Sequence, residues 1–284
     1  MRAIVAGIDL TSVGRRVADR ARIIAEAVDA ELTLVHVLEP MREAMIEPGL
    51  ARLMREYQKT EAERIAGWCR GRAAVTVSLE VVKGSPSWEL SARAKNAEMV
   101  VVGSSTVDAF TAGPVARRVA RKARVDALIV RRQPRVPYRR IIAAVDLSEA
   151  SRVAVKRAAE LFPGASITAL YSLPSRFDPI LSQAGLFKEE IDASRSRRLE
   201  VAKKRMAEFS EGLGEGIRTL VADGSPLETI DEVVRRRNAD LVVVGSRGAT
   251  ATRMVLLGTV AEGLISRAPC DVLVVRSKSA FRRP

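Results

Sequence analysis

Three glycines and a threonine near the C-terminus are the residues whose spacing most clearly points to chemistry. The stretch VVVGSRGATATRMVLLGT (242–259) contains Gly245, Gly248 and Gly258, and Thr259 follows directly. Glycines let backbone N–H groups approach an anion closely and adopt positive φ. A helix beginning near Thr259 would add unpaired N–H donors and a partial positive charge. The pattern therefore predicts a polyphosphate site, with a plain loop and helix cap as the alternative.

This loop differs from the common phosphate-binding motifs. No GxxxxGK[ST] occurs in the chain, so a catalytic P-loop lysine is absent. No GxGxxG follows a predicted strand either, and GLGEG (212–216) precedes a strand, which is typical of a turn.

The chain contains one sequence pattern twice. Five segments of the first half return in the same order in the second half, which indicates a tandem duplication. We expect one domain over 1–133, a second over 138–278, and RRQPRVPYRR (131–140) as the connection between them. The pairs are AIVAGIDLTS (3–12) and IIAAVDLSEA (141–150), LTLVHVLEP (32–40) and ITALYSLP (167–174), VVKGSP (81–86) and LVADGSP (220–226), NAEMVVVGS (96–104) and NADLVVVGS (238–246), VDALIVRR (125–132) and CDVLVVRS (270–277).

Each copy alternates short apolar runs with helical patterns. Such runs are typical of parallel strands covered on both faces, and their alternation with helices predicts a doubly wound, Rossmann-like α/β domain with a five-stranded parallel sheet. Thr11 and Ser148 are expected N-caps, and Pro86 and Pro226 suit a first helical turn. In the second copy we expect strands near 140–145, 167–172, 217–222, 240–245 and 271–276, and helices near 149–161, 188–211, 226–237 and 259–267.

The second copy resembles the ATP-binding universal stress proteins. Its glycines and Thr259 match the G-x2-G-x9-G-[S/T] motif of that family, and Asp146 in VDLSEA matches the acidic residue at the end of the family's first strand. The repeated KGSP and DGSP segments and the closing VLVVR are also typical. The resemblance covers nearly the whole chain as two tandem domains of this family.

The resemblance implies a role for each matching residue. Asp146 would contact ribose or adenine, Ala144 and Val145 would line the base, and Ser172 would offer backbone groups to adenine. The remaining implied contacts, with ribose or phosphates, are Gly245, Arg247, Gly248, Gly258, Thr259 and Val260, with Mg²⁺ assisting. Arg253 could reach a phosphate or remain an exposed loop residue. No catalytic residue or protein metal site is implied.

The first copy departs from the motif. Asp9 and His36-Val37 keep the family pattern, but Thr106 stands at the second glycine position, and nine residues separate Gly103 from Gly113. Pro114 replaces the Ser/Thr and so removes an N–H donor and a hydroxyl. We expect a degenerate first site and a competent second one.

Composition narrows the functional classes. The 284 residues are 47% hydrophobic and 29% charged, which is typical of globular protein, and 4% aromatic content disfavours stacking platforms for nucleic acid. The net charge of +13 favours polyanionic partners, but the basic residues are dispersed, so a solvated arginine-rich surface is the preferred interpretation. No apolar run could span a bilayer, and Cys69 and Cys270 lack CxxC neighbours, so a cytoplasmic location is expected.

Other candidate residues favour structural roles. His36, the single histidine, lies in an apolar strand run and is expected to be packed or hydrogen-bonded, and Cys69 to be buried. The helical stretch from Met41 to Trp68 could present Met41, Met45, Leu50, Leu53, Met54 and Tyr57 to a partner, but packing on its own sheet is the favoured interpretation.

These observations predict a cytoplasmic ATP-binding protein of the stress response that signals through its conformation or through an unidentified protein partner. The resemblance implies that the last strands of the two copies pair, as they do between domains in that family, and form an internal pseudo-dimer that could dimerise further. Such pairing would also cover exposed sheet edges. The sequence does not decide whether the protein is an enzyme, so a slow ATP hydrolase of the same fold is one alternative. The other alternative is a binder of nucleic acid or protein that acts without nucleotide, although nucleic acid is disfavoured.

Overall fold

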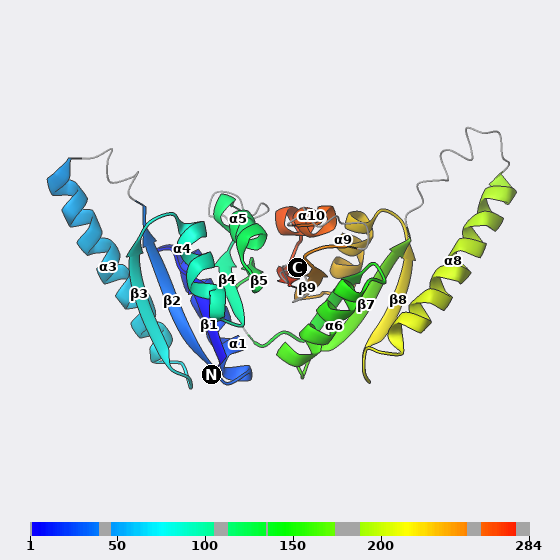
Figure 1. Ribbon diagram of the computed structural model, residues 1–284, viewed down its shortest axis with the longest axis horizontal. Helices are drawn as coiled ribbons and strands as arrows, with labels where there is room; N and C mark the ends of the chain where they lie inside the picture. Colours follow the sequence, from blue (N-terminus) through cyan, green and yellow to red (C-terminus); the bar gives the residue numbers. More distant parts are fainter. Residues whose placement is uncertain are drawn as a thin grey trace, which may run out of the picture.

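The computed structural model describes residues 2–39, 47–104, 113–134, 136–173, 188–248 and 257–276. Within these ranges the chain folds into two α/β halves with the same order of elements (Figure 1). The first half comprises β1 (Arg2–Gly7), α1 (Ser12–Ala27), β2 (Ala30–Leu38), α3 (Pro48–Arg70), β3 (Val77–Lys83), α4 (Pro86–Arg93), the 3₁₀ turn η1 (Ala94–Asn96), β4 (Met99–Gly103), α5 (Pro114–Lys122) and β5 (Asp126–Val130).

The second half repeats this order and confirms the helices and strands expected from the sequence to within a residue or so. Its elements are β6 (Arg140–Val145), α6 (Glu149–Leu161), β7 (Ser166–Leu173), α8 (Lys188–Ser210), β8 (Arg218–Asp223), α9 (Pro226–Arg236), β9 (Leu241–Gly245), α10 (Thr259–Arg267) and β10 (Asp271–Val275).

All ten strands form one sheet, in the order β3-β2-β1-β4-β5-β10-β9-β6-β7-β8. The strands run parallel within each half. The two halves meet where β5 pairs antiparallel with β10, with Leu128 opposite Leu273. The expected pairing of the last strands is therefore present, and it leaves neither of them as a free edge.

Helices cover both faces of this sheet. Side chains of α1, α3, α6 and α8 pack into a core on one face, and those of α4, α5, α9 and α10 into a core on the other. In β9, Val243 belongs to the first core while Val242 and Val244 belong to the second, as strand alternation requires. This double burial explains why the strands are apolar almost throughout.

The helix starts form as their sequences predict. The hydroxyl of Thr11 accepts a hydrogen bond from the Val13 amide, and that of Ser148 accepts one from the Ser151 amide. Pro86 and Pro226 each occupy the first turn of a helix, where the missing N–H costs no intrahelical bond.

Two buried aspartates tie the halves together. Asp271 accepts hydrogen bonds from the amides of Arg131 (2.7 Å) and Arg132 (3.0 Å) across the junction, and from the Tyr138 hydroxyl (2.6 Å). Its carboxylate lies 3.5 Å from the Arg20 guanidinium.

Asp126 holds the related position in the other half. It accepts from the Arg276 amide (2.9 Å) and from the Arg157 guanidinium (2.8 Å). Burial raises the pKa of both Asp126 and Asp271, against the lowering effect of their arginine partners.

The prediction that the long helix of the first half packs on its own sheet is wrong for the N-terminal part of this helix. Leu50, Leu53, Met54 and Tyr57 are between 42% and 69% exposed. Ala51 is the buried residue of the first turns, and the remaining buried residues lie further along, at Ala62, Ile65, Ala66 and Cys69. The helix covers the sheet only with its C-terminal half because its first turns extend beyond the strands (Figure 1). Met41 and Met45 lie outside the described residues.

The single histidine and the cysteine of this region have the structural roles expected. His36 is buried, with Nδ1 3.0 Å from the Ile8 carbonyl oxygen and Nε2 3.4 Å from Gln58 Oε1. Cys69 is fully buried. Within the described ranges, none of the helices combines the length and apolar character needed to cross a bilayer.

Candidate functional site

The candidate site lies at the carboxyl ends of β6 and β9, which are parallel neighbours in the centre of the second half. The chain leaves β6 at Asp146 and enters α6, and it leaves β9 at Gly245 and leads to α10. Two connections diverge here, to helices on opposite faces of the sheet. Ligands of open α/β sheets bind at such a switch point.

Gly248 makes a close approach to Asp146. A β-carbon on Gly248 would lie 2.7 Å from Asp146 Oδ2, a separation that real contacts do not tolerate. Only glycine therefore fits while the carboxylate keeps its position. The first part of the motif and the predicted strand-end aspartate form one local structure.

The third glycine of the motif, Gly258, lies close to Gly248. The Gly258 amide donates to the Ser246 carbonyl oxygen (2.9 Å), and a β-carbon on Gly258 would lie 3.7 Å from the Gly248 amide nitrogen. Gly258 is the N-cap of α10, so the start of this nine-residue helix, where the first amides have no intrahelical acceptor, lies beside Gly248. Arg253 lies outside the described residues.

The Asp146 carboxylate is held by the cap of α6. Its Oδ1 accepts hydrogen bonds from the Ser148 amide (3.1 Å) and the Ser148 hydroxyl (2.5 Å). The carboxylate is half-buried, Gly248 and Thr259 are exposed, and Arg247 and Val260 are half-buried, so the site is open to solvent along this edge.

Positive charge accumulates beside the loop. Arg276 directly follows β10 and is buried, and its guanidinium donates to the carbonyl oxygens of Ala120 and Arg121 (3.0 Å to Arg121). Burial, and then the nearby charge of Arg247, lower the pKa of Arg276 to about 10. An anion bound near Arg247 would relieve this repulsion.

Arg276 is not among the residues that the sequence predicts for this site. The available signal was the repeat itself, because Arg131 and Arg276 each follow the last strand of their copy.

The remaining predicted residues lie at the ends of β6 and β7. Ala144 and Val145 are buried and belong to opposite cores, and Gly245 is buried where β9 approaches the Ala150 carbonyl oxygen. Ser172 lies on the adjacent strand, and its hydroxyl donates to the Gly224 carbonyl oxygen (2.7 Å). This bond holds the Ser172 side chain within the protein.

The corresponding edge of the first half is built differently. Asp9 Oδ1 accepts from the Thr11 amide, the Thr11 hydroxyl and the Gly14 amide (3.0, 2.6 and 2.8 Å). A β-carbon on Gly103 would collide with the Val13 side chain, and α5 begins at Pro114, which has no N–H to donate. Thr106 lies outside the described residues.

The protein alone offers no preformed metal site in the part of the chain that the structure describes, since no group of three His, Cys, Asp or Glu residues occurs there. Thr259 is the first residue of α10 and carries a hydroxyl there.

Comparison with known proteins gives a consistent result over both halves. The model of the universal stress protein family matches residues 1–131 and again 137–276. Universal stress protein MJ0577 of Methanocaldococcus jannaschii is 29% identical over 160 residues, which cover 51% of this chain and 99% of that protein. A Thermus aquaticus universal stress protein is 31% identical over 144 residues, covering 49% of this chain and 99% of its own length.

A solved structure extends the likeness to the whole chain. The universal stress protein from Archaeoglobus fulgidus superposes with a TM-score of 0.66 over 96% of this chain and 98% of its own, at 18% identity. At that identity the likeness concerns the fold.

Proposed function

This chain belongs to the universal stress protein family, and on that basis we propose that its C-terminal domain binds ATP at the carboxyl edge formed by β6, β9 and α10. The observation that carries the proposal is the convergence of Asp146, Gly248 and Gly258 at the start of a helix. Their spacing matches the motif of the ATP-binding members of the family.

The residues present can supply each part of such a site. The amides of Gly248 and of the first turn of α10 would donate to phosphate oxygens, and Arg247 would add positive charge. Asp146 would accept hydrogen bonds from the ribose or adenine. Thr259 would help to hold Mg²⁺, which would neutralise part of the phosphate charge.

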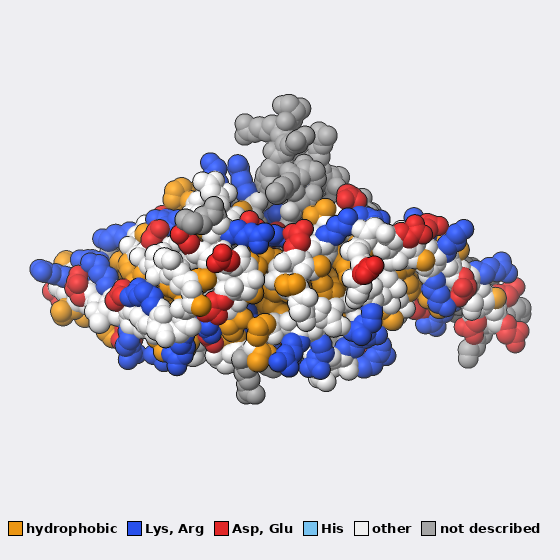
Figure 2. All heavy atoms as spheres, turned by 90° about the horizontal axis from the view of Figure 1, so that it is seen from below, with side chains coloured by type: hydrophobic (Ala, Val, Ile, Leu, Met, Phe, Trp, Pro, Cys, Tyr) orange, Lys and Arg blue, Asp and Glu red, His pale blue; other side chains and the backbone are white. Residues whose placement is uncertain are grey.

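The proposed output is a change of conformation or of protein partner in the cytoplasm during a stress response. No lysine follows the glycine loop as in a P-loop, so fast ATP hydrolysis is not part of the proposal. On the face that Figure 2 shows, Lys and Arg are interspersed with Asp and Glu, so this face gives no preference to nucleic acid.

Calorimetric titration with Mg-ATP, after removal of copurified nucleotide, tests the proposal. We expect one site per chain, with ADP and cyclic AMP titrated in parallel to define the preferred nucleotide. Gly248→Val should abolish binding because its side chain would occupy the space of the Asp146 carboxylate. Gly164→Ala is the matched control, since a β-carbon there meets nothing within 4 Å.

The number of ATP sites per chain tests whether only the second half binds the nucleotide. Two sites would contradict the inference that the first half has lost its phosphate loop. Absence of binding to the wild-type protein would overturn the ATP proposal. Equal loss in Gly248→Val and Gly164→Ala would also contradict it, because the loss would then report on general damage to the fold.

A further inference from the structure

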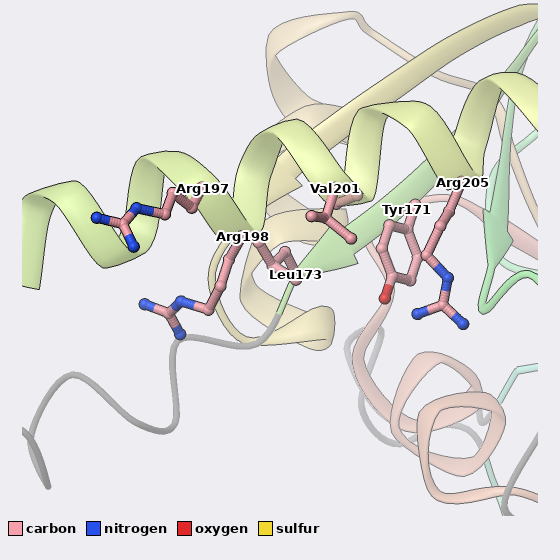
Figure 3. A pocket seen from close by; sticks show the side chains of 7 residues that line it. Tyr171, Leu173, Arg197, Arg198, Val201 and Arg205 are labelled. Atoms are coloured by element: carbon pink, nitrogen blue, oxygen red, sulfur yellow. The ribbon is translucent and has the colours of Figure 1, made fainter.

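A second concave site lies away from the glycine loop, between α8 and the end of β7. It is open to solvent and has a volume of about 270 Å³, and Figure 3 shows the arginines of α8 and Tyr171 and Leu173 of β7 that line it. The lining residues are Tyr171, Leu173, Arg197, Arg198, Val201, Ala202 and Arg205, and we call this site the arginine pocket.

The lining combines apolar groups with cations. Arg197, Arg198 and Arg205 lie on the side of α8 that carries Val201 and Ala202, of which Ala202 is buried against the sheet. Arg197, Val201 and Arg205 are exposed and Arg198 is half-buried, so the arginines border the site on its solvent side. Within the described part of the chain, neither Arg197 nor Arg205 forms an ion pair with a carboxylate.

The arginine pocket and the proposed nucleotide site use opposite faces of the sheet. Tyr171 packs against the core beneath α6 and α8. The neighbouring Ser172 points the other way, where its hydroxyl is 3.3 Å from Thr229 Oγ1 of α9. Helix α10, whose start forms the glycine site, packs into the core of that second face.

The first half shows that the fold does not require this arrangement. Helices α3 and α8 each have 23 residues, and buried Ala62 and Ala66 of α3 correspond to buried Ala202 and Met206 of α8. At this alignment Gln58 takes the place of Arg198, and it faces His36, the counterpart of Tyr171.

The other two arginines are replaced as well. Tyr57 corresponds to Arg197, and the buried Ile65 corresponds to Arg205. The first copy therefore has a hydrogen-bonded histidine and an apolar residue where the second has a pocket with three cations.

We propose that the arginine pocket binds a small organic phosphate with an aromatic or apolar body. Arginine guanidinium groups recognise phosphate through paired, charge-assisted hydrogen bonds. Leu173, Val201 and the Tyr171 ring would contact the body of the ligand. The pocket volume suits a small ligand, below the size of most drug-like sites.

Titration with 1-naphthyl phosphate tests this site, with binding followed by calorimetry. We expect one saturable site in the wild-type protein, and weaker binding of 1-naphthol and of inorganic phosphate, because each supplies half of the recognised chemistry. Arg197→Gln combined with Arg205→Gln should weaken 1-naphthyl phosphate binding about tenfold or more. The matched control, Lys203→Gln with Lys204→Gln, removes two charges from the same helix outside the pocket and should change binding by less than about twofold.

The Gly248→Val variant separates this proposal from the ATP proposal. It should bind 1-naphthyl phosphate as the wild-type protein does, even though its ATP binding is lost. The arginine pocket is overturned if the wild-type protein shows no saturable binding. It is also overturned if Gly248→Val abolishes binding while the Arg197→Gln/Arg205→Gln variant retains it, since the probe would then occupy the glycine site.

Discussion

Asp9 and Asp146 occupy equivalent positions in the two copies but have different surroundings. Asp9 Oδ1 caps its own helix through three hydrogen bonds, including one from the Gly14 amide. In Asp146 the bonds to Oδ1 come from Ser148, and the other oxygen, Oδ2, faces Gly248. The first aspartate therefore serves the fold, whereas the second also faces the proposed site.

Replacing each aspartate by alanine should separate these roles. Asp146→Ala is expected to weaken ATP binding at least tenfold, about 1.4 kcal/mol, because a ligand acceptor is lost. Asp9→Ala should leave ATP affinity within about twofold and lower the unfolding free energy by about 1–2 kcal/mol, since the start of α1 loses its acceptor. Calorimetry and urea unfolding measure the two effects. Equal loss of ATP affinity in both variants would contradict the assignment.

The two cysteines should be inert in the folded protein. Burial raises the pKa of the Cys69 thiol to about 11 and that of Cys270 to about 12, and the thiolate is the reactive species. At pH 8 we expect almost no reaction with Ellman's reagent in buffer and reaction of both thiols in concentrated urea. Rapid modification of either thiol in the folded protein would show that its side chain is accessible.

At the scale of elements, side-chain interactions join the two halves at the β5–β10 junction in addition to the backbone pairing of these strands. The carboxylate of the buried Asp271 accepts hydrogen bonds from the amides of Arg131 and Arg132, which follow β5. It also lies beside Arg20 of α1. A second, exposed pair crosses the same junction, where Arg121 of α5 meets Glu262 of α10 at 2.5 Å. The two pairs differ in burial, and Asp271 also accepts a hydrogen bond from the Tyr138 hydroxyl.

Replacing the acidic residue of each pair by alanine should lower the free energy of unfolding by very different amounts. Asp271→Ala leaves buried donors and a buried guanidinium without their acceptor, so we expect a loss of about 3–5 kcal/mol in the free energy of unfolding. Glu262→Ala should cost less than about 1 kcal/mol because its pair is solvated. Urea unfolding of the two variants measures the difference. Comparable values would mean that burial does not control the strength of this junction.

The elements could be predicted closely from the sequence, whereas their long-range contacts could not. Apolar runs such as 241–245 and caps such as Ser148 are local signals, and the structure confirms both. The exposure of Leu53 depends on how far α3 projects past the sheet, which periodicity does not encode. Arg205 lies in a helix rich in charge, and the sequence cannot show that this residue turns toward a pocket. The role of Asp271 likewise required knowing which strands meet.

For the whole molecule, the continuous sheet makes the two halves one structural unit. Every residue of β5 and β10 is buried, so separating the halves would expose two apolar strands and the charged network around them. Such a cost favours unfolding in a single step, although each half has its own helices and could bury its own core. Stability gained in one half should then be shared by the other.

Intrinsic fluorescence can test this coupling because both tryptophans, Trp68 and Trp88, belong to the first half. ATP at 100 times its Kd should stabilise the folded chain by about 2.7 kcal/mol, which for a protein of this size raises Tm by about 4–5 °C. We expect the tryptophan signal to shift by this amount, together with circular dichroism, even though ATP binds the other half. Gly248→Val should show no shift. A circular dichroism transition that splits on adding ATP, with the tryptophan transition unmoved, would mean that the halves unfold independently and that β5–β10 pairing does not transmit stability.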